Sequence, residues 1–142
     1  MQDNIRIPIR TEYDIVVARQ SGRALAEKLG FTGSDLTVIA TAISEVARNI
    51  VQYAKVGEVI IQPANQSARS GILVIARDQG PGISDLEKAM EDGYTTGAGL
   101  GLGLPGARRL VDEFQITSET GKGTTVTMKK WTHTDVEWKR SH

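Results

Sequence analysis

Two glycine-rich runs constrain this chain more than any other feature of its sequence. Residues 78–82 read Asp-Gln-Gly-Pro-Gly, and residues 97–103 carry four alternating glycines. Glycine adopts positive φ angles and lets backbone N–H groups approach a ligand closely, so such loops suit a polyphosphate. Asp78 follows an apolar run, and its carboxylate would repel phosphate but could accept a hydrogen bond from a purine amino group. The sequence therefore predicts a bound nucleotide, with its base at Asp78 and its phosphates at the second run.

A tight turn would also account for the first glycine run. Residues 80–82 read Gly-Pro-Gly, which is typical of a turn after a strand. The second run needs a stronger reason, because each glycine inside an element costs roughly 0.5–1 kcal/mol relative to alanine. An anion-binding loop that leads into a helix at Pro105 supplies one.

Two familiar phosphate-binding motifs are not supported by this sequence. A Walker A loop is excluded, since no Gly-Lys-Ser or Gly-Lys-Thr occurs in the chain. Residues 101–106 match the letters of the dinucleotide-binding pattern G-x-G-x-x-G, and Glu119 falls where a ribose-binding acid would stand. That pattern must follow directly on a strand, whereas the stretch before it is polar. We interpret the match as accidental.

Composition narrows the class of protein. The 142 residues fit one domain with one core. Basic and acidic residues number 17 each, and no basic run suggests a nucleic-acid partner. The chain has no cysteine, which excludes disulfides and thiolate metal sites and fits a reducing compartment. Neither a signal peptide nor a membrane span of about 18 apolar residues is visible, so we expect a cytoplasmic protein.

Hydrophobic periodicity predicts helices mixed with hairpin-connected strands. The expected helices cover residues 11–29, 35–54 and 105–114, with a short helical piece at 86–90, and the expected strands cover residues 5–9, 58–62, 71–77, 114–118 and 124–131. Gly30 is the expected C-terminal cap of the first helix, and polar residues 32–35 supply N-cap candidates for the second. These elements pack naturally as a two-layer α/β sandwich with a mixed, mainly antiparallel sheet and helices on one face. We expect a single ATP-binding domain at residues 1–131 and a polar tail at residues 132–142.

Glu45 and Asn49 are polar residues within the apolar second helix. They stand four positions apart, so they share one helix face. An isolated pair of this kind is usually a solvated edge of the apolar stripe. If the pair instead faces the triphosphate, Asn49 could offer its side-chain oxygen to Mg²⁺, and Glu45 could accept a proton from an attacking hydroxyl.

The order of four short motifs resembles that of the GHKL ATP-binding superfamily, which includes gyrase, heat-shock chaperone, histidine kinase and MutL ATPases built on the Bergerat fold. The motifs are Glu45-x-x-x-Asn49, Asp78-x-Gly80-x-Gly82, Gly99-x-Gly101-x-Gly103 and Gly121-x-Gly123-Thr124. The resemblance implies that Glu45 is the catalytic base, that Asn49 binds Mg²⁺ and that Asp78 reads the adenine amino group. The other nucleotide-binding residues that it implies are Gly80, Gly82, Gly97, Gly99, Leu100, Gly101, Leu102, Gly103 and Thr124.

Within the superfamily, a chain of this length looks like the anti-sigma-factor serine/threonine kinases. Residues 101–114 are most similar to the RsbT-type switch kinases of the stressosome. That resemblance implies Mg-ATP-dependent phosphorylation of STAS-domain partner proteins, and exchange of those partners for a phosphatase regulator. The alternative function is an anti-sigma factor that binds a sigma factor under nucleotide control with little turnover. A dinucleotide-binding protein is a third possibility.

One departure concerns the charge available for the γ-phosphate. Lys88 is the single basic residue between positions 83 and 98. Arg108 and Arg109, expected in the first turn of the helix that begins at Pro105, are candidates to supply that charge, and Lys55 is a weaker one. The favoured alternative for the two arginines is a solvated helix face, which is ordinary for an exposed helix.

Overall fold

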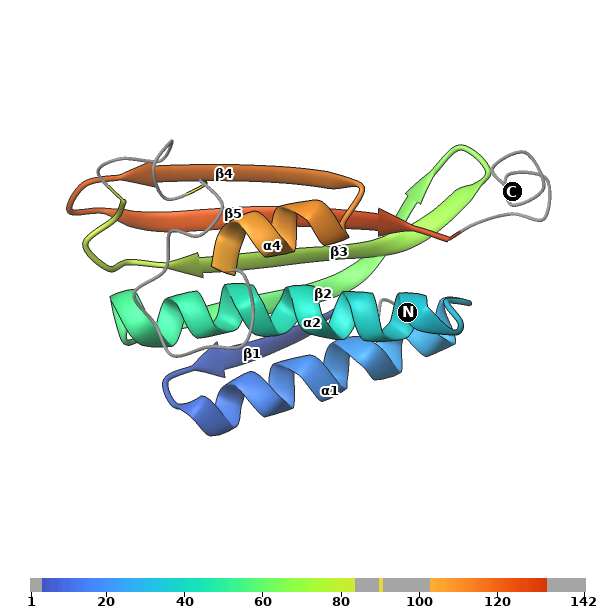
Figure 1. The fold of residues 1–142 in the computed structure, drawn as a ribbon, viewed down its shortest axis with the longest axis horizontal. Helices are drawn as coiled ribbons and strands as arrows, with labels where there is room; N and C mark the ends of the chain where they lie inside the picture. The colour runs from blue at the N-terminus through green and yellow to red at the C-terminus, as the bar shows by residue number, and fades with distance from the viewer. Residues whose placement is uncertain (1–3, 84–89, 91–102, 133–142) are drawn as a thin grey trace.

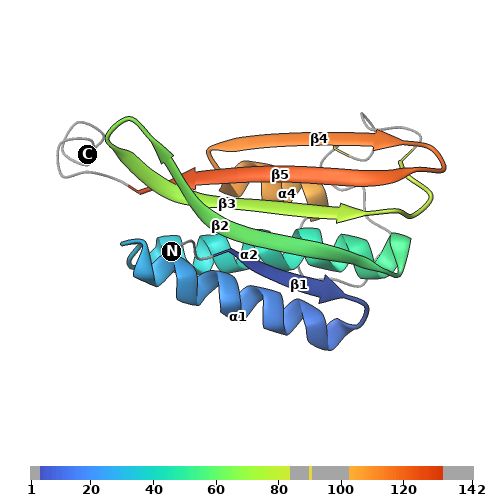
Figure 2. The same ribbon diagram turned by 180° about the vertical axis from the view of Figure 1, so that it is seen from behind.

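The computed structural model describes residues 4–83, 90 and 103–132 as two packed layers. In chain order the elements are β1 (Ile5–Ile9), α1 (Glu12–Lys28), α2 (Ser34–Asn49), the π-helix η1 (Ile50–Ala54), β2 (Gly57–Gln66), β3 (Arg69–Asp78), α4 (Gly103–Leu110), β4 (Glu113–Glu119) and β5 (Gly123–Trp131). The helices α1, α2 and α4 all lie on one face of the sheet (Figure 1). Seen from behind, the strands lie in front of the helices (Figure 2). This arrangement confirms the predicted α/β sandwich.

The sheet has five strands in the order β1-β2-β3-β5-β4, and every pairing between them is antiparallel. Alternation along each strand places one set of side chains toward the helices and the other set toward the open face. The predicted edge strand β1 pairs only with β2 in this order. Pro8 therefore stands on an edge strand, where its missing N–H does little harm.

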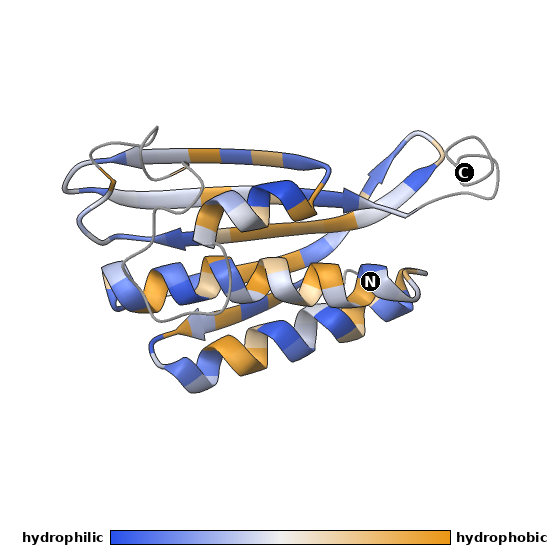
Figure 3. Cartoon of the chain, viewed as in Figure 1, coloured by the Kyte–Doolittle hydropathy of each residue, from blue (hydrophilic) through white to orange (hydrophobic). Residues whose placement is uncertain are grey.

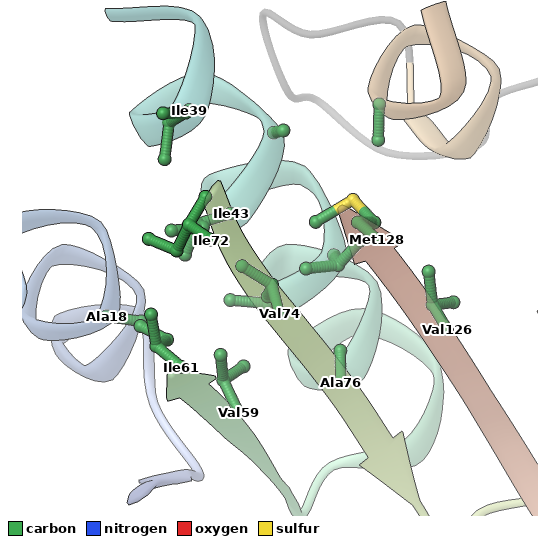
Figure 4. Packing of buried hydrophobic residues seen from close by; sticks show 14 of the residues in the cluster. Ala18, Ile39, Ile43, Val59, Ile61, Ile72, Val74, Ala76, Val126 and Met128 are labelled. Carbon is green, nitrogen blue, oxygen red and sulfur yellow. The ribbon is translucent and has the colours of Figure 1, made fainter. Parts of the chain in front are cut away.

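The core lies between the helices and the inner face of the sheet. Hydrophobic residues recur along the helices and along the strands (Figure 3), and the buried hydrophobic cluster draws on both layers. Aliphatic side chains of α2 meet those of the central strands, and Ile43, Ile61 and Val74 are almost fully buried there (Figure 4). A core of this kind agrees with the low aromatic content of 5%.

The first two helices follow the sequence prediction with two corrections. Helix α1 ends at Lys28, and Gly30 has the positive φ of 102° that favours glycine there. Helix α2 begins after Gly33, with no side-chain cap, so the expected polar N-cap is absent. The predicted helix at residues 35–54 is divided, because the Lys55 N–H donates to the Ile50 carbonyl 2.8 Å away, five residues back, and closes a π-type turn.

Three other boundaries differ from the prediction. Strands β2 and β3 extend through the polar stretch expected to be a loop, because their register continues to Gln66 opposite Arg69 around a two-residue turn. Helix α4 begins at Gly103 and ends at Leu110. Phe114, expected both at the end of that helix and at the start of the strand 114–118, belongs to the strand, β4, and pairs with Met128. At the β2–β3 turn and at Phe114, long-range strand pairing overrides the local pattern.

On the open face of the sheet, Glu58 joins three strands. Its carboxylate accepts hydrogen bonds from Arg6 at 2.7 Å and from Arg77 at 2.6 Å. The bond from Arg77, and then that from Arg6, lowers the pKa of Glu58 below its ordinary value of 4.5. A carboxylate whose pKa is lower in the folded state than in the unfolded chain stabilises the fold at pH values above the unfolded-state pKa. This contribution is lost as the pH falls through the lowered, folded-state pKa.

We therefore expect Glu58→Gln to lower the free energy of unfolding at neutral pH, with the difference from wild type disappearing at acid pH. Denaturant titrations at the two pH values measure this difference. Glu119→Gln is the matched control, because Glu119 is 68% exposed and its ion pair with Lys122 spans 3.5 Å. A Glu58→Gln deficit that is equal at both pH values would contradict the role of charge.

Candidate functional site

Asp78 is the last residue of β3, at the end of the sheet reached by η1. Its Oδ1 atom accepts the backbone N–H of Gly80 at 2.9 Å and that of Thr124 at 3.3 Å. These two bonds hold Oδ1 in place. Within the described residues, Oδ2 has no hydrogen-bond partner, so it is available to accept a hydrogen bond from a ligand.

The glycines of the first run allow three segments to meet. A Cβ on Gly80 would lie 2.6 Å from the Cβ of Ala54 in η1. A Cβ on Gly82 would press on the backbone of Glu119, and the neighbouring Pro81 carbonyl accepts the Gly121 N–H at 2.7 Å. The loop is thus held between η1 and the β4–β5 turn. The role of these glycines in nucleotide binding stays a prediction.

Thr124 lies next to Asp78 because β3 and β5 are neighbours in the sheet. It is buried, and its Oγ1 lies 2.8 Å from the Oγ of Ser118 on β4. Ser118 also accepts the Ile83 N–H at 2.7 Å and donates to the Gly123 carbonyl at 3.2 Å. Sequence reasoning missed Ser118, although strand alternation places it on the inner face opposite Thr124.

Glu45 is buried on α2, with 6% of its surface exposed. Its Oε1 accepts the backbone N–H of Gly103 at 3.2 Å, at the first residue of α4. Its Oε2 lies 3.2 Å from Nη1 of Arg48, one turn along α2. Glu45 is therefore no solvated surface residue, and the carboxylate is held by donors from two elements.

Asn49 is the last residue of α2, one turn beyond Glu45, and is half-buried. Its side chain makes no hydrogen bond to another described residue, so its oxygen is available to a ligand. The described residues contain no group of three or more acidic or histidine side chains that could hold a metal ion. A single amide oxygen suits Mg²⁺ only if phosphate oxygens and water complete its shell, which is how Mg²⁺ usually binds beside a nucleotide.

The predicted site residues thus lie on, or in contact with, the C-terminal half of α2 and the π-helix η1 that continues it. Glu45 contacts the start of α4, Asn49 comes one turn later, and Ala54 packs on the loop after Asp78. At about 1.5 Å of rise per residue, the span from Glu45 to Ala54 is roughly 13 Å, on the scale of an extended nucleoside triphosphate. The predicted residues Gly97, Gly99, Leu100, Gly101 and Leu102, together with Lys88 and residues 86–89 of the expected helical piece, lie outside the described residues.

Comparison with known proteins decides the family. Residues 7–130 match the family described as the histidine kinase-like ATPase domain. The chain belongs to this family. The match confirms the resemblance to the GHKL superfamily that the four motifs indicated. The sheet excludes the dinucleotide-binding alternative. Proteins of that kind have a mostly parallel sheet, whereas all pairings among the described strands are antiparallel.

Individual relatives within the histidine kinase-like ATPase family fall into two groups. The serine/threonine-protein kinase RsbT of Bacillus subtilis is 50% identical over 131 residues, which cover 92% of this chain and 98% of that protein. The anti-sigma F factor of Thermoanaerobacter sp. is 34% identical over 83% of this chain and 85% of that protein. The anti-sigma F factor of Halalkalibacterium halodurans is 33% identical over 80% of this chain and 81% of that protein.

The similarity to the kinase, at 50% identity over 92% of the chain, confirms the predicted enzyme class, a protein serine/threonine kinase that uses ATP. None of the helices in the described part of the chain has the length and apolar character to cross a membrane.

Proposed function

We propose that this protein transfers the γ-phosphoryl group of Mg-ATP to a serine or threonine of a STAS-domain partner protein, in a cytoplasmic partner-switching pathway of the stressosome type. The observation that carries the proposal is the buried Glu45 carboxylate on the same helix as Asn49, at the opposite end of the site from Asp78. The 50% identity to a serine/threonine kinase supports the reaction class.

Each residue has a defined task in the proposed reaction. Asp78 Oδ2 accepts the adenine amino group, and Asn49 offers an oxygen to Mg²⁺, which when bound neutralises phosphate charge. The acceptor hydroxyl oxygen forms a bond to the γ-phosphorus as the bond to the ADP oxygen breaks. Glu45 receives the hydroxyl proton, so the products are a phosphorylated side chain and ADP.

Glu45→Gln is the test of this proposal. Glutamine keeps an oxygen that can accept the Gly103 N–H, but it cannot take a proton, so transfer from γ-labelled ATP to STAS-domain proteins of the same cell should fall about 10²–10⁴-fold with ATP binding retained. Glu58→Gln is the matched control, because Glu58 also pairs with arginine but lies on the open face of the sheet. Unchanged transfer by Glu45→Gln would refute the assigned base.

The anti-sigma factors at 33% and 34% identity favour a second candidate. In that function the protein binds a sigma factor, nucleotide controls its conformation, and turnover is slight. It predicts ATP-sensitive association with a sigma factor and no labelled protein product. A co-sedimentation experiment with and without ATP, run beside the transfer assay, separates the two functions.

A further inference from the structure

Arg48 stands between the two polar residues that the motif singles out on α2. It pairs with Glu45 three positions away, at 3.2 Å, and its side chain is 30% exposed against 7% for Glu45. An exposed pair of this spacing contributes at most about 1 kcal/mol and needs no functional role. Here one partner is buried, so removal of the arginine would leave a carboxylate without its charge partner.

The Glu45 carboxylate occupies a position that suits an anion. Its donors are the Arg48 guanidinium and the backbone N–H of Gly103 at the start of α4. The guanidinium comes from α2 and the backbone N–H from the start of α4. Gly103 lies 58 positions along the chain from Glu45. A guanidinium and a backbone N–H are both donors that bind phosphate oxygens well.

The other candidate cations for the γ-phosphate lie elsewhere. Arg108 and Arg109 occupy the last turn of α4, not its first turn as expected, and both are exposed. Arg108 lies five positions after the first residue of α4, or about 7.5 Å of helix rise. Lys55 is exposed at the end of η1, beside the loop that follows Asp78. Arg48, in contrast, lies on α2 and contacts Glu45 directly.

We propose that Arg48 is a further catalytic residue, which binds the γ-phosphate of ATP after exchanging the Glu45 carboxylate for it. The proposal rests on the proposed kinase function for its reaction. Positive charge at the transferring phosphoryl group stabilises the charge of the transition state. The exchange also releases Glu45 Oε2 to accept the proton of the acceptor hydroxyl. Without nucleotide, Arg48 and Glu45 neutralise each other.

The γ-phosphate is what distinguishes ATP from ADP, so the preference between these nucleotides measures the contact directly. In Arg48→Gln we expect the affinity for Mg-ATP to fall about 10–100-fold, because a hydrogen bond to a charged group contributes about 1.5–3 kcal/mol. Affinity for Mg-ADP should change by less than about threefold. Calorimetric titration of both nucleotides gives the two values, and the phosphoryl transfer rate should fall with the ATP preference.

Two further variants serve as controls. Arg48→Lys keeps the charge but loses the planar fork, so it should recover part of the ATP preference. Arg6→Gln makes the same chemical change in an arginine that is ion-paired on the open face of the sheet, and it should leave both affinities unchanged. A thermal melt of each variant checks that it is folded.

Several outcomes would overturn the inference. Equal losses of ATP and ADP affinity in Arg48→Gln would show a structural role for Arg48, and so would a failure of Arg48→Lys to bind ATP better than Arg48→Gln. A wild-type protein without preference for ATP over ADP would also contradict it. If the wild type prefers ATP in an Arg48-dependent way but labels no protein, the proposed function fails and the phosphate contact stands.

Discussion

Replacing Asp78 with asparagine is expected to weaken ATP binding by about 100-fold or more while the fold is retained. Oδ1 of Asp78 accepts two backbone N–H groups, from Gly80 and Thr124. In the variant the amide oxygen must stay in that position, because an NH₂ group there would face two donors. The NH₂ group therefore replaces Oδ2. In the proposed binding mode it confronts the adenine amino group donor to donor, which removes a charge-assisted hydrogen bond and leaves both donors unpaired.

Equilibrium binding of ATP measures the effect, and GTP provides an internal check. Guanine presents a carbonyl where adenine presents its amino group, so Asp78→Asn should shift the preference between ATP and GTP toward GTP. Asp112→Asn is the matched control, because Asp112 is an exposed carboxylate that also accepts a backbone N–H from β5, that of Trp131 at 2.8 Å. Full ATP affinity in a folded Asp78→Asn variant would show that the base binds elsewhere.

Replacing Gly123 with alanine is expected to destabilise the protein by about 3 kcal/mol or more. Its φ of 113° is a conformation that residues with a side chain rarely adopt, and such strain costs of order 1–3 kcal/mol. A Cβ there would also collide with the backbone carbonyl of Asp78. Backbone cannot move aside as a flexible side chain can, so the clash adds to the strain and displaces the Asp78 carboxylate, which we propose accepts the adenine amino group.

Gly121→Ala separates the two causes. Gly121 lies in the same turn with a φ of 81°, but a Cβ there meets nothing within 4 Å. It should therefore cost only the strain, about 1–2 kcal/mol, and leave ATP affinity nearly intact. Denaturant unfolding and ATP titration of both variants give the comparison. Equal destabilisation by the two substitutions would mean that the Asp78 backbone yields to the extra methyl group.

Local pattern was sufficient to predict that helices α1, α2 and α4 exist and which face of α2 is buried, but not where every helix begins and ends. The spacing of Leu36, Ile39 and Ile43 indicated the buried stripe of α2, and all three are buried. The pattern failed where tertiary pairing decided the boundary. Residues 63–66 read as the start of a polar loop, yet they continue β2, because the register with β3 satisfies their backbone groups.

The candidate site shows the same division. The motifs singled out Glu45, Asn49, Asp78 and Thr124, and the structure brings Asp78 and Thr124 into hydrogen-bond contact. Ser118 carried no motif, because a serine on a short strand is an ordinary residue until its neighbours are known. Arg48 was visible three positions after Glu45, but spacing alone does not show that the carboxylate is buried.

The sequence by itself determined the class of fold, the order of the motifs and hence the histidine kinase-like ATPase family. These depend on periodicity and on residue types that lie close together along the chain. Only the tertiary structure decided that Glu45 meets the first N–H of α4 across 58 positions, and that Asp78 is held by Thr124 across 46. Such contacts are set by how the sheet and helices pack. A backbone N–H is common to every residue except proline, so the sequence does not indicate which N–H will donate to a given carboxylate.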